Sequence, residues 1–137
     1  MNARDADSKE LILRTAGRLK AMKEFAPPAW AKFVKTGAGK ERTPTNIDWW
    51  FVRAASMLRK IYLKPVGVAR LKTIYGTSKK RGTAPKRHYK ASGSIIRKVL
   101  KQLEAAGFVK IDEKKKGRVI TPNGQKFLDS VSKELKK

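Results

Sequence analysis

Residues 48–63 read DWWFVRAASMLRKIYL, a segment without Gly or Pro whose first residue, Asp48, can cap a helical turn. At about 100° per residue its side chains divide into two faces. The wide apolar face carries Trp50, Phe51, Ala54, Ala55, Met57, Leu58, Ile61 and Tyr62. A face of this width is typical of a helix packed by several neighbours. We therefore predict a central helix over 48–63 with this face in the core.

The opposite, narrow face of the central helix places an indole among cations. Trp49, Arg53, Ser56 and Lys60 follow one another at i+3 and i+4 spacings, with Arg59 beside them. Such a face can be merely solvated, with the tryptophan packed under a loop, or it can bind a partner. From residue 49 to residue 103 the chain holds fifteen Lys and Arg and no Asp or Glu. Because a surface of one sign repels itself, this run favours a polyanion partner, of which nucleic acid is the commonest.

The composition of the whole chain points to the same class of partner. Its 137 residues, 40% of them apolar, suffice for one domain with its own core, and the net charge of +23 exceeds what solubility needs. The absence of cysteine rules out disulfides and thiolate zinc sites. No apolar run approaches the roughly 20 residues that span a bilayer, and no secretory signal is visible. We expect a soluble, intracellular protein; a basic helix lying on an anionic membrane is disfavoured because the cations are dispersed over several elements.

The rest of the chain divides at apolar repeats and turn residues. In order, we predict an N-terminal helix (7–23), a short helix (28–35), the central helix (48–63), a helix (67–75), a basic loop (77–92), a helix (94–106), a wing hairpin (108–121) and a C-terminal helix (122–136). The short helix is expected to bury Trp30 and Phe33. Helix 94–106 is the cleanest amphipathic segment, and Gly107 suits the left-handed residue that ends a helix.

The basic loop over 77–92 has no apolar periodicity, which in a compact domain is typical of a functional or disordered segment. Its basic and aromatic residues are Lys79, Lys80, Arg81, Lys86, Arg87, His88, Tyr89 and Lys90. We predict that it becomes ordered on a phosphate backbone, with His88 and Tyr89 able to stack on bases. The alternative for His88 is an ordinary exposed imidazole. It has no Cys, second His or nearby carboxylate for metal binding or catalysis.

The order of these elements, three helices followed by a hairpin, predicts a winged helix-turn-helix. The fold class is mainly α, formally α+β, with an extra N-terminal helix and a small β-hairpin wing in a single domain over 1–137. The outward face of helix 94–106 offers Arg97, Lys98 and Lys101, which suit phosphates better than base edges.

Five groups of residues follow one another along the chain. They are PAWAKFVKTG at 28–37, DWWFVRAAS at 48–56 with Arg59, YG at 75–76 with Gly82 and Pro85, SIIRKVL at 94–100, and GR at 117–118 with TPNG at 121–124. In this order the chain resembles the S19e family of archaeal and eukaryotic small-subunit ribosomal proteins. The resemblance implies a winged-helix protein in the head of the small ribosomal subunit, in contact with ribosomal RNA and neighbouring ribosomal proteins and needed for subunit maturation.

The positions that face RNA in that family match residues already selected by charge. They are Trp49, Arg53 and Arg59 on the central helix, Arg97 and Lys98 on helix 94–106, and the basic loop. Lys60 and Lys101 share those faces and complete the predicted RNA-binding set. We also expect a cytoplasmic, ribosomal location and, outside the ribosome, a monomer.

Two other classes of function remain as alternatives. A winged-helix transcription regulator would insert helix 94–106 into the major groove of DNA, on the same architecture. An enzyme is disfavoured, because the sequence shows no glycine loop for phosphates, no metal cluster and no nucleophile with a base. The only adjacent acids, Asp112 and Glu113, lie in a predicted hairpin turn. No cofactor is expected.

Overall fold

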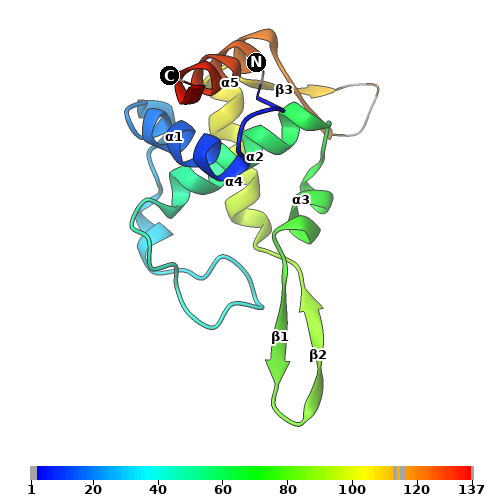
Figure 1. The fold of residues 1–137 in the computed structure, drawn as a ribbon. Helices are drawn as coiled ribbons and strands as arrows, with labels where there is room; N and C mark the ends of the chain where they lie inside the picture. Colours follow the sequence, from blue (N-terminus) through cyan, green and yellow to red (C-terminus); the bar gives the residue numbers. More distant parts are fainter. Residues whose placement is uncertain (1–2, 113, 115–116, 137) are drawn as a thin grey trace.

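The computed structural model describes residues 3–112, 114 and 117–136, and its helices form a body from which one hairpin projects (Figure 1). Within these residues the helices are α1 (Ser8–Lys20), α2 (Trp49–Leu63), α3 (Val68–Ile74), α4 (Gly93–Ala105) and α5 (Pro122–Lys136), with short 3-10 helices at Lys23–Phe25 and Ala29–Lys32. The strands are β1 (Thr77–Arg81), β2 (Ala84–Tyr89), β3 (Val109–Asp112) and β4 (Gly117–Ile120). No helix in the described part of the chain is long and apolar enough to span a membrane.

The central helix α2 is the element on which the core is built. It packs against α1, α4, α5 and β4. As predicted, its wide face is buried, with Trp50 only 1% exposed and Tyr62 alone of the predicted set half-buried. Trp50 is also tied by a polar contact, because its indole N–H donates to Gln102 Oε1 at 2.8 Å. The Gln102 amide N–H donates in turn to the carbonyl of Ala26 at 2.9 Å, so both ends of this buried amide are satisfied.

The winged-helix prediction is confirmed by the second half of the chain. Strands β3 and β4 pair antiparallel, with Val109 opposite Ile120, and Arg118 forms two backbone hydrogen bonds with Val66 just before α3. Of the turn predicted between these strands, Glu113, Lys115 and Lys116 lie outside the described residues.

The end of α4 also forms as predicted. Gly107 has a φ of +82°, its N–H donates to the carbonyl of Glu104, and the N–H of Phe108 donates to the carbonyl of Leu103. These two bonds satisfy carbonyls of the last turn and direct the chain into the wing.

The segment predicted as a basic loop is instead the antiparallel hairpin β1–β2, which projects from the body (Figure 1). Lys79 lies opposite Arg87 and Ser78 opposite His88, and Gly82 supplies a positive φ of +68° at the turn. Both faces of the hairpin are exposed to solvent along most of its length. A strand with two solvated faces needs no apolar alternation, which is why the sequence pattern missed it.

Smaller predictions near the N-terminus were also wrong. The first helix ends at Lys20, and the short helix is a single 3-10 turn that leaves Phe33 80% exposed and Trp30 39% exposed. Asp48 does not cap α2 with its side chain; its carboxylate accepts from Lys20 Nζ at 3.2 Å, which fastens α1 to the start of α2.

Candidate nucleic-acid interface

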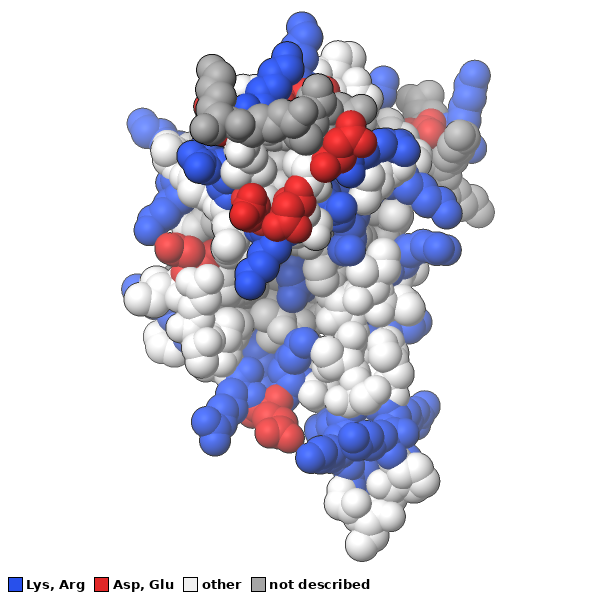
Figure 2. All heavy atoms as spheres, in the orientation of Figure 1, with Lys and Arg blue, Asp and Glu red and all other residues white. Residues whose placement is uncertain are grey.

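The β1–β2 hairpin concentrates positive charge. The exposed side chains of the predicted set are Lys79, Lys80, Arg81, Lys86, Arg87, His88 and Lys90, while Tyr89 is half-buried with Lys79 Nζ 5.7 Å from its ring centre. Figure 2 shows Lys and Arg crowding this hairpin, whereas most acidic side chains on the same view lie on the helical body. The hairpin therefore presents a single sign of charge on both faces.

The register of the hairpin sets like charges against each other. Lys79 and Arg87 are direct cross-strand partners. Like charges in this position destabilise a two-stranded hairpin, which is marginal by itself. Ligands that neutralise both cations would remove this repulsion, and a phosphate backbone is such a ligand.

The N-terminal half of α4 lies beside the base of the hairpin. Arg97, Lys98 and Lys101 are all exposed, as predicted. A Cβ added at Gly93 would lie 2.8 Å from Arg97 Nη1 and 3.5 Å from Lys72 Cδ, so the Arg97 guanidinium reaches back toward the start of α4, next to a cation of α3.

Three segments distant in sequence are fastened together at the hairpin base. The N–H of Ala91 donates to the carbonyl of Lys72 at 2.9 Å, and the N–H of Ser92 donates to the carbonyl of Thr36 at 2.8 Å. Gly37 forms an isolated bridge with Ala91. One continuous region therefore contains the hairpin, the start of α4 and the long segment before α2.

Arg53 is less exposed than the sequence indicated. It is half-buried, and its guanidinium carbon lies 4.1 Å from the centre of the Tyr75 ring. Burial lowers the pKa of Arg53 from its ordinary value, and Tyr75 partly opposes this effect. None of the ion pairs formed by the described residues includes Arg53, and its Nη1 is buried without a hydrogen-bond partner.

Tyr75 links α2 to the base of the hairpin. Its hydroxyl is 2.6 Å from the Ser56 hydroxyl, and Lys60 Nζ lies 5.6 Å from its ring centre. Burial raises the pKa of Tyr75, while the hydrogen bond with Ser56 and the nearby Arg53 act in the other direction. In the sequence, Tyr75 stands out only as part of the YG pair at 75–76.

Trp49, which was predicted to face RNA, is held in the fold by contacts of its own. It is half-buried, its indole N–H donates to the carbonyl of Ala31 at 3.3 Å, and its ring meets that of Trp50 edge to face at 5.5 Å. Arg59 is likewise half-buried, with a buried Nε that has no hydrogen-bond partner. The narrow face of α2 is therefore recessed, whereas the predicted cations of the hairpin and of α4 are exposed.

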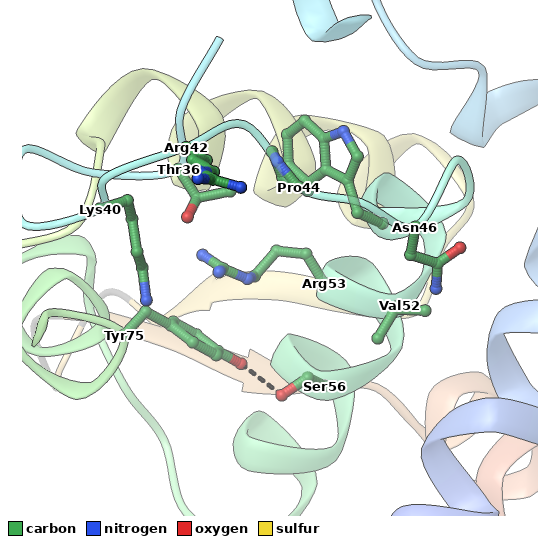
Figure 3. Close-up of a pocket in the computed structure, with 10 residues that line it drawn as sticks. Thr36, Lys40, Arg42, Pro44, Asn46, Val52, Arg53, Ser56 and Tyr75 are labelled. Atoms are coloured by element: carbon green, nitrogen blue, oxygen red, sulfur yellow. Dashed lines mark hydrogen bonds between the residues drawn. The ribbon is translucent and has the colours of Figure 1, made fainter.

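A cleft of about 430 Å³, here called the Arg53 cleft, opens between α2 and the segment before it (Figure 3). It is lined by Thr36, Lys40, Arg42, Pro44, Asn46, Trp49, Val52, Arg53, Ser56 and Tyr75. Arg53 extends across this cleft from α2, with Lys40, Arg42 and Tyr75 around its guanidinium (Figure 3). Lys40 and Arg42 were missed because Glu41 separates them and no periodicity marks the loop.

The described residues offer no alternative metal chemistry. No group of three or more His, Cys, Asp or Glu among them could hold a metal ion. This surface can bind anions through the exposed cations around the hairpin and the recessed cations in the Arg53 cleft.

The chain is similar to known proteins along nearly its whole length. The family model described as Ribosomal protein S19e matches residues 2–137. The small ribosomal subunit protein eS19 of Aeropyrum pernix is 47% identical over 138 residues, covering 98% of this chain and 90% of its own. That of Emericella nidulans is 44% identical, covering 97% and 90%, and the eS19G protein of Ascaris suum is 40% identical, covering 98% and 92%. The chain therefore belongs to the ribosomal protein S19e family.

Proposed function

We propose that this protein is a structural component of the small ribosomal subunit, which binds ribosomal RNA in the subunit head and supports assembly and maturation of the subunit. It acts in the cytoplasmic ribosome beside neighbouring ribosomal proteins and is a monomer before incorporation. Family membership supports the ribosomal role, since the relatives are small-subunit proteins.

The observation that carries RNA binding is the β1–β2 hairpin, a two-stranded element with same-sign cross-strand partners and no acid in its sequence. Such an element contributes little to a hydrophobic core, and its cations suit a phosphate backbone. The exposed cations of α4 extend this surface at the hairpin base.

Recognition through this surface depends on RNA shape more than on sequence. Lys and Arg contact phosphates, and the narrow major groove of double-helical RNA keeps base edges out of reach. The DNA-binding alternative finds no support in the relatives, all of which are named as ribosomal proteins. Small-subunit ribosomal RNA should bind more tightly than duplex DNA of equal length in a competition assay.

The test compares two double charge reversals in cells of the source organism. Arg97→Glu with Lys98→Glu alters exposed cations of α4, and Lys126→Glu with Lys133→Glu makes the same charge change on exposed positions of α5. On sucrose gradients the native protein and the α5 variant should sediment with small subunits, while the α4 variant should remain near the top. Depletion of the native protein should cause small-subunit precursors to accumulate. Sedimentation of the native protein away from small subunits would refute the proposal.

A further inference from the structure

We propose that the Arg53 cleft receives one unpaired nucleotide of the bound RNA, with its phosphate at the guanidinium of Arg53 and its base against the apolar wall formed with Trp49. This inference deepens the proposed function and rests on it. It assigns to the cleft a different role from that of the hairpin and α4, which contact the RNA backbone.

The charge of Arg53 is not compensated by an ion pair among the described residues. Its Nη1 is buried without a hydrogen-bond partner, and the described residues give it no carboxylate, so the Tyr75 ring is its principal partner. A recessed cation without an anion is costly for the fold. A phosphate in the cleft supplies both the missing charge and acceptor oxygens, and guanidinium groups bind phosphates in two-bond geometry.

Positive charge is concentrated at one end of the cleft. Lys40 and Arg42, from the segment before α2, lie at the same end as the Arg53 guanidinium (Figure 3). Three cations from two separate parts of the chain therefore surround one small volume. Convergence of this kind suits a phosphate group better than a solvated surface, where charges of both signs are mixed.

Part of the remaining wall of the cleft is apolar. Trp49, Pro44 and Val52 line the cleft with flat and aliphatic surface. The Trp49 ring is held in place by its hydrogen bond to Ala31 and its contact with Trp50. A fixed aromatic ring beside a phosphate site matches the two parts of a nucleotide, because bases stack on such rings.

The size of the cleft limits what can enter. Its volume of about 430 Å³ lies in the range of small-ligand sites. A paired and stacked base cannot reach a recessed wall, whereas a bulged or loop nucleotide can turn out of the helix at modest cost. The occupant is therefore a single unpaired nucleotide, and paired RNA binds only to the exposed cations.

The experiment uses the full chain and two RNA hairpins that differ only in one bulged 2-aminopurine nucleotide. The bulged hairpin should bind about tenfold more tightly than the fully paired one, the scale expected for one stacked base. Fluorescence of the 2-aminopurine should be quenched on binding. In nuclear magnetic resonance spectra of the native protein, the Arg53 side-chain N–H signals should shift with the bulged hairpin and not with the paired one.

A filling variant separates the cleft from the exposed surface. Val52→Trp occupies the cleft without changing charge, and Leu13→Trp adds the same ring at an exposed position of α1 as a control. Val52→Trp should bind both hairpins with the affinity of the paired one, and Leu13→Trp should retain the tenfold preference. If Val52→Trp melts well below the native protein, Arg42→Gln is used in its place, because Arg42 is exposed at the rim of the cleft. Arg42→Gln should lower the preference for the bulged hairpin over the paired one.

Each remaining outcome has a definite meaning. Equal binding of both hairpins by the native protein overturns the inference and leaves the proposed function intact. Failure to bind either hairpin or small-subunit ribosomal RNA overturns the proposed function itself. A free mononucleotide, uridine monophosphate, should bind far more weakly than the bulged hairpin; equal affinity would make a free nucleotide the occupant and overturn the assignment to RNA.

Discussion

Arg53 is a single side chain whose recessed charge lowers the stability of the fold. Its charge is recessed beside Tyr75 and lacks an anionic partner among the described residues. Replacing such a cation by an apolar side chain of similar length is often neutral or stabilising. Arg53→Met should therefore leave the melting temperature unchanged or raise it, while lowering affinity for small-subunit ribosomal RNA about tenfold. Calorimetry and filter binding on the same samples measure both, and a large fall in melting temperature would contradict this account.

Tyr75 provides a pH-dependent prediction at the same scale. Burial raises its pKa above the ordinary value of 10.0. Because the folded state favours the protonated phenol, the associated stability is fully present below the pKa of the unfolded chain, about 10. It is lost as pH rises above that value and through the folded pKa.

Alkaline unfolding monitored by circular dichroism should show this loss. Tyr75→Phe, which removes the titrating hydroxyl, should flatten the decline in stability above pH 10 relative to the native protein. Tyr89→Phe, which removes a hydroxyl from the projecting hairpin, serves as the control and should leave the decline unchanged. An identical decline in native protein and Tyr75→Phe would disprove this role.

Among the elements, the β1–β2 hairpin is destabilised by the like charges that face each other across its strands. Lys79→Glu replaces a repulsive cross-strand pair by an attractive one opposite Arg87. Hydrogen exchange of hairpin amides should therefore slow in the free variant, while its affinity for ribosomal RNA falls. Lys126→Glu, with the same charge change on α5, should alter neither quantity much. Faster exchange in Lys79→Glu would show that like-charge repulsion does not limit this hairpin.

The helices could be predicted from sequence wherever burial imposes a pattern. The apolar face of α2 and the Gly107 cap of α4 both follow from such patterns. The β1–β2 hairpin could not be predicted from the sequence, because its residues face water on both sides and show no alternation of apolar and polar residues. The exposure of Phe33 was missed for a related reason, since aromatic residues at helical spacing suggest a core whether or not a helix forms.

The candidate site was predictable in its charge and unpredictable in its shape. An acid-free run of cations identified the hairpin and the outward face of α4. The Arg53 cleft depends on Lys40, Arg42 and Tyr75, which come from segments before and after α2 and meet only in the folded chain. The spacing of these residues along the sequence does not indicate that they lie together in the fold.

At the scale of the whole molecule, the net charge of +23 makes the proposed binding to RNA sensitive to salt. If about six phosphates are neutralised, affinity should fall on the order of a thousandfold between 50 and 200 mM salt. The double variant Arg97→Glu with Lys98→Glu should show a shallower dependence, because fewer counterions are released. A nearly flat response of the native protein would be incompatible with a phosphate-binding surface.

The projection of the β1–β2 hairpin has a consequence for how firmly the protein is held. Strand β1 has 5 residues, and at roughly 3.3 Å for each its tip reaches about 16 Å from its base. In the proposed complex, the body and the tip of the hairpin would contact stretches of RNA that are remote in the nucleotide chain. Once one contact has formed, the second would form at a high effective concentration. Dissociation would then require both contacts to break at the same time.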